Sequence, residues 1–483
     1  MSMMKNDIKA EEKGIDHIAS EINDNTSSNT SVGKRFFQID VMKTICIICV
    51  IGVHTLAPFT RYDELWQVLQ PVPLFFVIMG FNFGNSFKKK NLHKLSDMYN
   101  FKYFKRMFWR LIFPLLLINL ICFLVDLIVL FSTGYHINGW SSTQLQPVSW
   151  GGTNLDYGTQ AWGSTYTDMN IFYFLIGTPY FPGPGEFYVV ILIQFILIFP
   201  LIYKLFEKHP ILGLVSCYII EISFQLIAGN VPLVSGFFDN YTFLFCGNIL
   251  RYMSVIGLGI WFVNNHNLFS KRNSFIIIMA IPAIFLLIMT YWGQLFIPNF
   301  LNNPIINNIF KVGGKGYSLD FFRTIPWWGK ANLFTYFWPA LVFLIFMKVL
   351  PSNLNKEKPR SQSVSKFFEK FSKLTYHILL VQIVYFFISI PIYYGVSISF
   401  NGSFYDAFIS PIASSFGITH SYDNFSVLSL KAAIGVSIMK LFVIFINCAI
   451  TFTLAIWLSK LDLGIQKYLK KSGNIHFKTK LKI

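Results

Sequence analysis

Ten runs of apolar residues follow one another along the chain, separated by polar or charged segments. Each run is close to the ~20 helical residues needed to cross a hydrocarbon core of ~30 Å. This length predicts membrane-spanning helices, because a membrane β-barrel would instead show alternating segments of ~10 residues. The predicted spans are residues 41–59, 68–86, 111–132, 187–205, 210–229, 241–263, 274–292, 331–350, 374–394 and 431–459.

Composition supports the same fold class. The chain has 483 residues, of which 54% are hydrophobic and only 13% are charged. These values exclude an ordinary soluble protein. We therefore expect an all-α integral membrane protein with about ten spans.

The basic residues report the orientation of these spans. The net charge of +17 would also be compatible with nucleic-acid binding, so the position of each Lys and Arg is the relevant test. With the N-terminus in the cytoplasm, the inside segments carry 30 Lys and Arg and the outside loops carry 6. This bias predicts that both termini are cytoplasmic, and it makes a nucleic-acid partner unnecessary.

The predicted domain organisation is simple. Residues 1–38 are rich in Ser, Thr, Asn and charged groups, which is typical of a disordered cytoplasmic tail. A membrane domain over 39–460 follows, and 461–483 form a basic cytoplasmic tail. The first apolar run is long enough to span, so it should insert without a cleavable signal peptide. The chain is therefore expected to lie in a membrane that it crosses several times.

Long loops on the predicted outer face are candidates for substrate contact. The loop 133–185 has no Lys or Arg and contains Trp140, Trp150 and Trp162 among hydroxyl-bearing residues. Aromatic faces beside hydroxyls and amides suit a carbohydrate acceptor. An aromatic belt at the membrane interface gives the same composition, so both interpretations remain open.

Two polar residues in the first span share one helix face. Lys43 and His54 are eleven residues apart, which is three turns plus about 20°, and ~16 Å along the axis. Charged groups within spans are functional candidates. Each also has a structural explanation, because Lys43 can reach the lipid headgroups or Asp40, and His54 can bond to a neighbouring helix.

A basic stripe precedes the third span. Lys102, Arg106 and Arg110 follow one another at intervals of four residues. In a regular helix they form one face, which suits a polyanion such as the phosphates of a nucleotide cofactor. A contact with membrane lipid phosphates is the alternative.

Acidic residues near the membrane complete the set of candidates. Glu221 and Arg251 lie at similar predicted depth in adjacent spans, where a structural pair is favoured over a substrate path. Glu186 lies at the predicted outer end of the fourth span, either lining an outer cavity or exposed at the interface.

The CxxC of Cys46 and Cys49 has no second pair, so we interpret it as packing and expect no metal.

Five segments together resemble the acyltransferase-3 family of bacterial membrane acyltransferases, which have ten spans. The first, IDVMKTICIICVIGVH, has the family pattern of a basic residue, ten others and a histidine. The second and third are similar to its FFxxSGF segment and to its basic pair before proline. The fourth matches a span in the middle of the chain, and the fifth resembles GxxSYxIYLxH. The segments are residues 39–54, 73–81, 105–114, 183–201 and 372–384.

The chain departs from the family pattern at three places. Met79 replaces a usual serine, and the basic pair Arg106 and Arg110 is one residue wider than usual. Gln382 replaces a common histidine, which leaves His54 as the main histidine candidate.

The resemblance implies transfer of an acyl group, commonly acetyl, from cytoplasmic acyl-coenzyme A to a hydroxyl of an extracytoplasmic polysaccharide or glycan. Lys43, Arg106 and Arg110 would bind the coenzyme phosphates, His54 would be the catalytic residue, and Glu186 would contact the substrate. His54 would act as a general base or accept the acyl group itself. The polysaccharide biosynthesis machinery is a possible partner. A transporter or flippase of a glycan precursor is the alternative, and a structural subunit of a glycan synthase is a third.

Overall fold

The structure is a computed structural model, and the described part of it is entirely helical where it is regular. Residues from Phe37 onward form one compact unit. The structure describes residues 36–55, 69–133, 177, 179–181, 183, 185–231, 233–234, 245–296, 335–352, 359–399 and 430–480.

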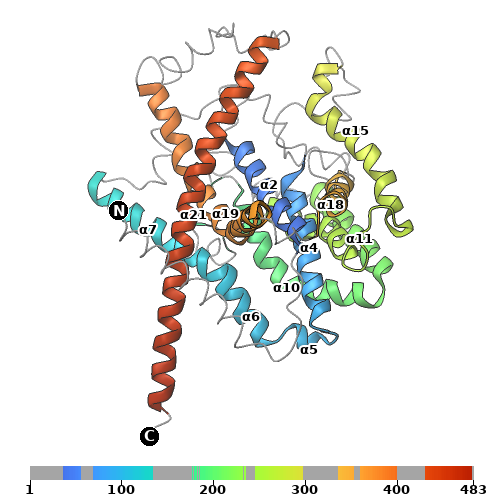
Figure 1. Cartoon of the computed structure of the whole chain (residues 1–483), viewed down its shortest axis with the longest axis horizontal. Helices are drawn as coiled ribbons and strands as arrows, with labels where there is room; N and C mark the ends of the chain where they lie inside the picture. Colours follow the sequence, from blue (N-terminus) through green and yellow to red (C-terminus); the bar gives the residue numbers. More distant parts are fainter. Residues whose placement is uncertain are drawn as a thin grey trace. The chain divides into compact units, whose positions relative to one another are not determined.

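Figure 1 traces the described helices and labels most of them. They are α2 (Phe37–His54), α4 (Pro71–Lys89), α5 (Leu95–Met98), α6 (Phe101–Met107), the π-helix η2 (Phe108–Ile112), α7 (Phe113–Thr133), α10 (Phe187–Lys208), α11 (Pro210–Asn230), the 3₁₀-helix η3 (Ile249–Tyr252), α14 (Met253–Trp261), the 3₁₀-helix η4 (Lys271–Asn273), α15 (Ser274–Phe296), α18 (Phe337–Val349), α19 (Pro359–Ser399) and α21 (Leu430–Lys480).

Each predicted span contains a helix, but the helices differ in length and apolarity. Within the described residues, seven are long and apolar enough to cross a membrane. Two more apolar helices, Ile249–Trp261 and Phe337–Val349, are shorter. The described chain is therefore a helical membrane protein with seven candidate spanning helices.

The sixth predicted span, 241–263, differs from the expected continuous helix. The backbone turns at Gly247 and Asn248, and the helix starts again at Ile249. Asn248 caps this start, because its side-chain oxygen accepts a hydrogen bond of 3.0 Å from the Leu250 amide. The apolar run continues across this turn, so hydropathy alone does not reveal it.

Helix α2 lies in the middle of the packing around the site. It packs against α19, α4, α18 and α21, and α4 also packs closely on α14. Glycine permits the α4–α14 contact, since a Cβ on Gly80 would lie 2.4 Å from the Ile256 carbonyl oxygen. Small residues at such crossings allow close backbone approach between membrane helices.

A buried apolar core joins α2, α7, α10, α19 and α21. These helices come from both ends of the chain, and their core includes Ile47, Cys122, Val189, Ile383 and Ala455. The core surrounds the ends of α2 and α10, where the candidate histidine and glutamate lie. It is therefore the scaffold that holds the candidate site.

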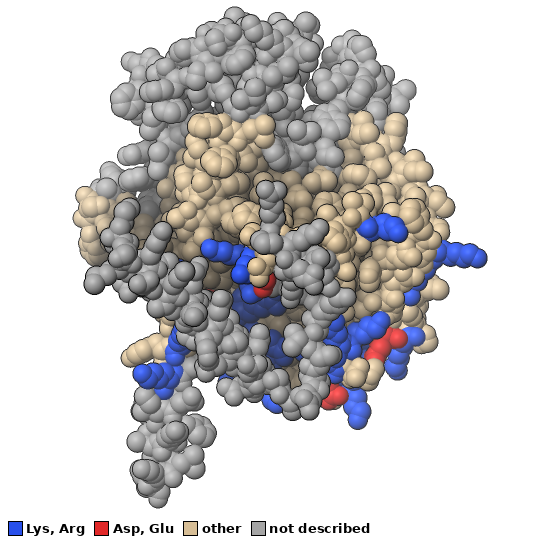
Figure 2. Space-filling view, viewed as in Figure 1, with Lys and Arg blue, Asp and Glu red and all other residues tan. Residues whose placement is uncertain are grey.

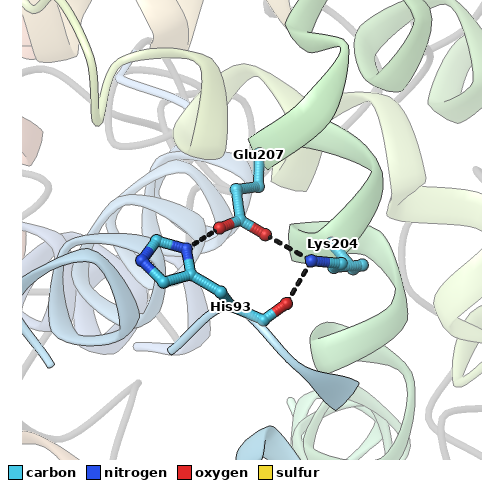
Figure 3. Close-up of polar contacts among 3 residues, drawn as sticks. All are labelled: His93, Lys204 and Glu207. Carbon is cyan, nitrogen blue, oxygen red and sulfur yellow. Dashed lines mark hydrogen bonds and ion pairs between the residues drawn. The ribbon is translucent and has the colours of Figure 1, made fainter. Parts of the chain in front are cut away.

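The segment between α4 and α6 is attached to α10 by polar contacts. Figure 3 shows that the Glu207 carboxylate receives contacts from the His93 ring and from Lys204. The Lys204 ammonium also donates to the His93 carbonyl. Further along, the Tyr103 hydroxyl donates to the Ile196 carbonyl at 3.0 Å. These contacts fix α6, which carries part of the basic stripe.

Candidate active site

His54 is the last residue of α2, at the end opposite to the predicted cytoplasmic tail. The next residue, Thr55, closes the final turn by donating its hydroxyl to the Ile51 carbonyl at 2.7 Å. The His54 ring is half-buried and lies 6.1 Å, between centroids, from the ring of Phe386 on α19. Because α2 is one uninterrupted helix from Phe37, Lys43 and His54 keep the spacing along the helix that the sequence predicts.

The segment before α10 is held against two helices. The Tyr180 hydroxyl donates to the Asp126 carboxylate at 2.7 Å, and the Tyr180 amide donates to the Asn119 side chain at 2.9 Å. Phe181 is completely buried and stacks on Phe387, with 5.1 Å between ring centroids. Residues from α7 and α19 therefore fix this segment on both sides.

Two glycines bring the same segment close to α19 and to His54. A Cβ on Gly183 would lie 2.0 Å from the Ile383 carbonyl oxygen, so only glycine fits there without displacement. Gly185 has a φ of +91°, which L side chains rarely adopt. The motif GPGEF thus has a steric reason for its first glycine and a conformational reason for its second.

Gly185 lies close to both His54 and Gln382. A Cβ built on Gly185 would lie 3.8 Å from His54 Nε2 and 3.6 Å from Gln382 Nε2. The two nitrogens are therefore no further apart than the sum of these two distances. Gln382 is completely buried, and neither atom of its amide has a hydrogen-bond partner among the described residues.

Glu186 follows Gly185 and directly precedes α10. Its side chain is completely buried, which excludes the exposed interfacial position that the sequence left open. The Glu186 amide donates to the Gly183 carbonyl at 3.2 Å, so the carboxylate belongs to the same ordered turn. The structure therefore places the predicted Glu186 and His54 in one region.

A polar chain beside His54 links three helices. The Asn447 side chain on α21 donates to the Thr55 hydroxyl at 3.0 Å, and it accepts a hydrogen bond of 2.7 Å from the Tyr385 hydroxyl on α19. The sequence alone did not reveal Asn447, Tyr385 or Asp126. The available signal was a polar side chain within an apolar run, which is a rare and costly feature of membrane helices.

Arg106 and Arg110 lie on a different part of the chain, at the junction of α6 and η2. Both side chains are exposed, and neither guanidinium is paired with an acidic group among the described residues. In the view of Figure 2, the described Lys and Arg side chains lie in the middle and lower part of the molecule. Partial burial and the charge of Arg106 lower the pKa of the nearby Lys90. Several cations therefore share this region, and such a region favours a polyanion.

The helix that carries these arginines is not a regular α-helix throughout, as the predicted stripe assumed. Residues Phe108–Ile112 form a π-helix, a feature that often occurs at functional sites. Two neighbouring helices bind its backbone: Tyr376 donates to the Leu111 carbonyl at 2.8 Å, and Gln466 donates to the Trp109 carbonyl at 3.1 Å. The position of Arg110 thus depends on α19 and α21.

Lys43 is half-buried on α2, eleven residues before His54 on the same helix. The described contacts do not join it to Arg106 or Arg110 in one cluster. The structure brings together His54, Glu186 and Gln382, while the cation site remains a prediction from its charge and position.

Glu221 and Arg251 form a separate buried cluster. The Glu221 carboxylate accepts hydrogen bonds from the Ser254 amide at 2.9 Å and from the Ser254 hydroxyl at 2.5 Å. Glu221 therefore caps the start of α14. The Arg251 guanidinium packs over the Phe245 ring, 4.8 Å from its centroid. These contacts agree with the structural role that the sequence favoured.

Comparison with known families decides the class of protein. The family described as acyltransferase domain, Acyl_transf_3, matches residues 36–460. The chain belongs to the acyltransferase-3 family. No curated protein and no solved structure matches it.

Membership makes this protein an acyltransferase with an acyl donor. Among the described residues, His54 lies next to Gly185 and the buried polar side chain of Gln382. Gln382 was noted in the sequence only as a departure from a motif, and its position beside His54 could not be read from the chain.

Proposed function

We propose that this acyltransferase moves an acyl group, acetyl being the first candidate, from cytoplasmic acyl-coenzyme A to a hydroxyl of an extracytoplasmic glycan. The main support is the position of the His54 imidazole, which faces Gly185 and a buried glutamine amide. The exposed arginine pair provides the second support, since it has no acidic partner among the described residues.

The proposal includes ten spans, cytoplasmic termini and a location in a bacterial cytoplasmic membrane. Helices occur at all ten predicted positions, and the positive-inside bias of 30 to 6 sets the direction. In this orientation Lys43 is near the inner surface, and His54 is in the outer half of the membrane. The acyl group therefore travels along α2 from donor to acceptor.

The reaction needs only a few groups. Arg106, Arg110 and Lys43 hold the phosphates of the coenzyme, and the pantetheine arm extends towards His54. In one route His54 takes the proton of the glycan hydroxyl as its oxygen attacks the thioester carbon. In the other, His54 Nε2 attacks first and then passes the acyl group to the hydroxyl oxygen. In both routes the carbon–sulfur bond breaks and the proton ends on the coenzyme thiolate.

The proposed contacts of the acceptor are the aromatic loop 133–185 and Glu186. Trp140, Trp150 and Trp162 lie outside the described residues, so the carbohydrate surface rests on composition. Glu186 lies close to the reacting histidine in the chain fold and is the proposed contact for an acceptor hydroxyl. A polysaccharide biosynthesis complex would supply the glycan.

The test is a comparison of His54→Ala with a matched control, His209→Ala. His209 is exposed, lies just before α11 and is not one of the candidate site residues. Thiol release from acetyl-coenzyme A is measured with membranes that contain the surface polysaccharide. We expect His54→Ala to reduce turnover by about 10²-fold to 10⁴-fold, and His209→Ala to retain it.

Full turnover by a well-expressed and folded His54→Ala would remove His54 from the mechanism. The same assay addresses the transporter alternative, because a flippase would move glycan without releasing the coenzyme thiol. Ester analysis of the surface polysaccharide, with and without the gene, would identify the acyl group and the acceptor together.

A further inference from the structure

Gln382 differs from two other buried glutamines that the structure describes. Gln38 donates to the Leu350 carbonyl at 3.1 Å, and Gln225 donates to Glu221 at 3.1 Å. Gln382 is completely buried, yet its amide nitrogen and oxygen have no partner among the described residues.

An unpaired amide in such a place is unfavourable. A buried donor or acceptor that loses water without gaining a partner destabilises the folded state, so nearly all such groups are paired in native proteins. A leucine or methionine of similar volume would fill the same space without this penalty. The amide is therefore more easily explained if a ligand supplies its missing partner.

The surroundings indicate which ligand this is. Gln382 Nε2 and His54 Nε2 are 3.6 Å and 3.8 Å from one common point, the Cβ position that Gly185 leaves empty. A group that reacts at His54 Nε2 therefore lies near this point. The glutamine nitrogen carries two N–H donors, which suit a carbonyl oxygen that gains negative charge.

We propose that the Gln382 amide donates a hydrogen bond to the carbonyl oxygen of the acyl group during transfer at His54. This inference rests on the proposed role of His54. When the nucleophile bonds to the carbonyl carbon, the C=O electron pair moves to the oxygen, and Gln382 stabilises that oxyanion. The pair then returns as the carbon–sulfur bond breaks, and the thiolate receives the proton. Gln382 thus serves both routes, whichever atom attacks.

The backbone around Gln382 is suited to this task. Gly183 contacts the carbonyl of the next residue, Ile383, so the GPGEF segment is fixed against this turn of α19. The Tyr385 hydroxyl, one turn further along, bonds to Asn447, which also holds Thr55 next to His54. The donor and the histidine are therefore fixed by one framework, as electrostatic stabilisation of a transition state requires.

The experiment compares two substitutions at Gln382. Gln382→Met keeps the length and shape but removes both donors, and Gln382→His keeps an N–H donor. Gln225→Met is the matched control, since it removes a buried amide that bonds to Glu221 in the separate buried cluster. Each variant is purified in detergent, and its thermal unfolding is recorded. Thiol release is then measured over a range of acetyl-coenzyme A concentrations, with a surface-polysaccharide fraction of the producing cells as acceptor.

We expect Gln382→Met to lower kcat by about 10²-fold to 10³-fold, as for removal of one oxyanion donor, with the KM for acetyl-coenzyme A little changed. Gln382→His should keep most of the turnover, and Gln225→Met should keep all of it. Gln382→Met should unfold at the wild-type temperature or above, because it removes an unpaired amide. If it does not fold, Gln382→Leu replaces it in the same comparison.

Several results would overturn the assignment. Wild-type kcat in the folded Gln382→Met variant, or equal losses in the Met and His variants, would show that the amide donor is not used. If His54→Ala is inactive while Gln382→Met is fully active, only the Gln382 role fails. If the wild type itself releases no thiol from acetyl-coenzyme A, the proposed donor fails, and the Gln382 role fails with it.

Discussion

Replacing Gly183 by alanine tests whether the tight contact between the GPGEF segment and α19 controls the active site. The added Cβ would lie 2.0 Å from the Ile383 carbonyl oxygen and 2.8 Å from its carbon. Both are main-chain atoms, so no side-chain rotation relieves the clash. Alanine therefore forces the two backbones apart.

The size of the displacement follows from these distances. Real Cβ contacts are essentially never shorter than 3.0 Å, so a contact of 2.0 Å requires a movement of about 1 Å. Overpacking of this kind typically destabilises a protein by about 1–3 kcal/mol. A misplacement of about 1 Å near reacting groups can lower a rate by about 10²-fold. Gly185 and Glu186 would move with Gly183 relative to His54.

The control is Gly464→Ala on α21, where an added Cβ meets nothing within 4 Å. In a helix this change should stabilise slightly, by up to about 1 kcal/mol. Thermal unfolding in detergent and acyl-transfer turnover are measured for both variants. We expect a lower Tm and a turnover reduced by about 10²-fold for Gly183→Ala alone. Wild-type Tm and turnover in Gly183→Ala would refute the close approach and its link to catalysis.

Three further predictions concern the cation site, its support from α19, and the segment before α10. Arg106→Ala and Arg110→Ala should each raise the KM for acyl-coenzyme A, and the increase should be larger at low salt. The control Lys366→Ala, at an exposed position, should leave this KM unchanged. Equal KM values in the arginine variants and the wild type would exclude a phosphate contact. Tyr376→Phe removes the hydroxyl bound to the π-helix, so it should lower stability by about 1 kcal/mol and weaken donor binding, measured by calorimetry with acetyl-coenzyme A. Tyr180→Phe removes a hydrogen bond to a buried carboxylate and should lower Tm and turnover together; a turnover unchanged at lower Tm would separate this anchor from catalysis.

Local features of the site were predictable because they depend on one helix. The first span was predicted from its apolar run, and α2 is continuous over the interval from Lys43 to His54. Rise and rotation per residue are constant in an α-helix, so the common face and the separation of ~16 Å required no knowledge of neighbours. The family motif likewise identified His54 before any contact was known.

The assumption of regular geometry also explains what the sequence missed. The stripe of basic residues assumed an unbroken α-helix, but Phe108–Ile112 is a π-helix whose carbonyls bond to side chains of α19 and α21. Those partners lie more than 250 positions away in the chain. A widened turn of this type is stabilised by distant groups, so a local pattern cannot show it.

The residue pattern of the chain was enough to assign the helical membrane class and to predict the spans, their direction and the candidate histidine. Only the tertiary structure placed Gln382 beside His54, Gly183 against Ile383, and Asn447 between Thr55 and Tyr385. The physical reason is that lipid and protein interior are both apolar. Phe445 on α21 is 71% exposed and Phe81 on α4 is 1% exposed, although both are phenylalanines in apolar runs. Hydropathy therefore locates the helices, whereas close backbone contacts and buried polar pairs decide which faces meet.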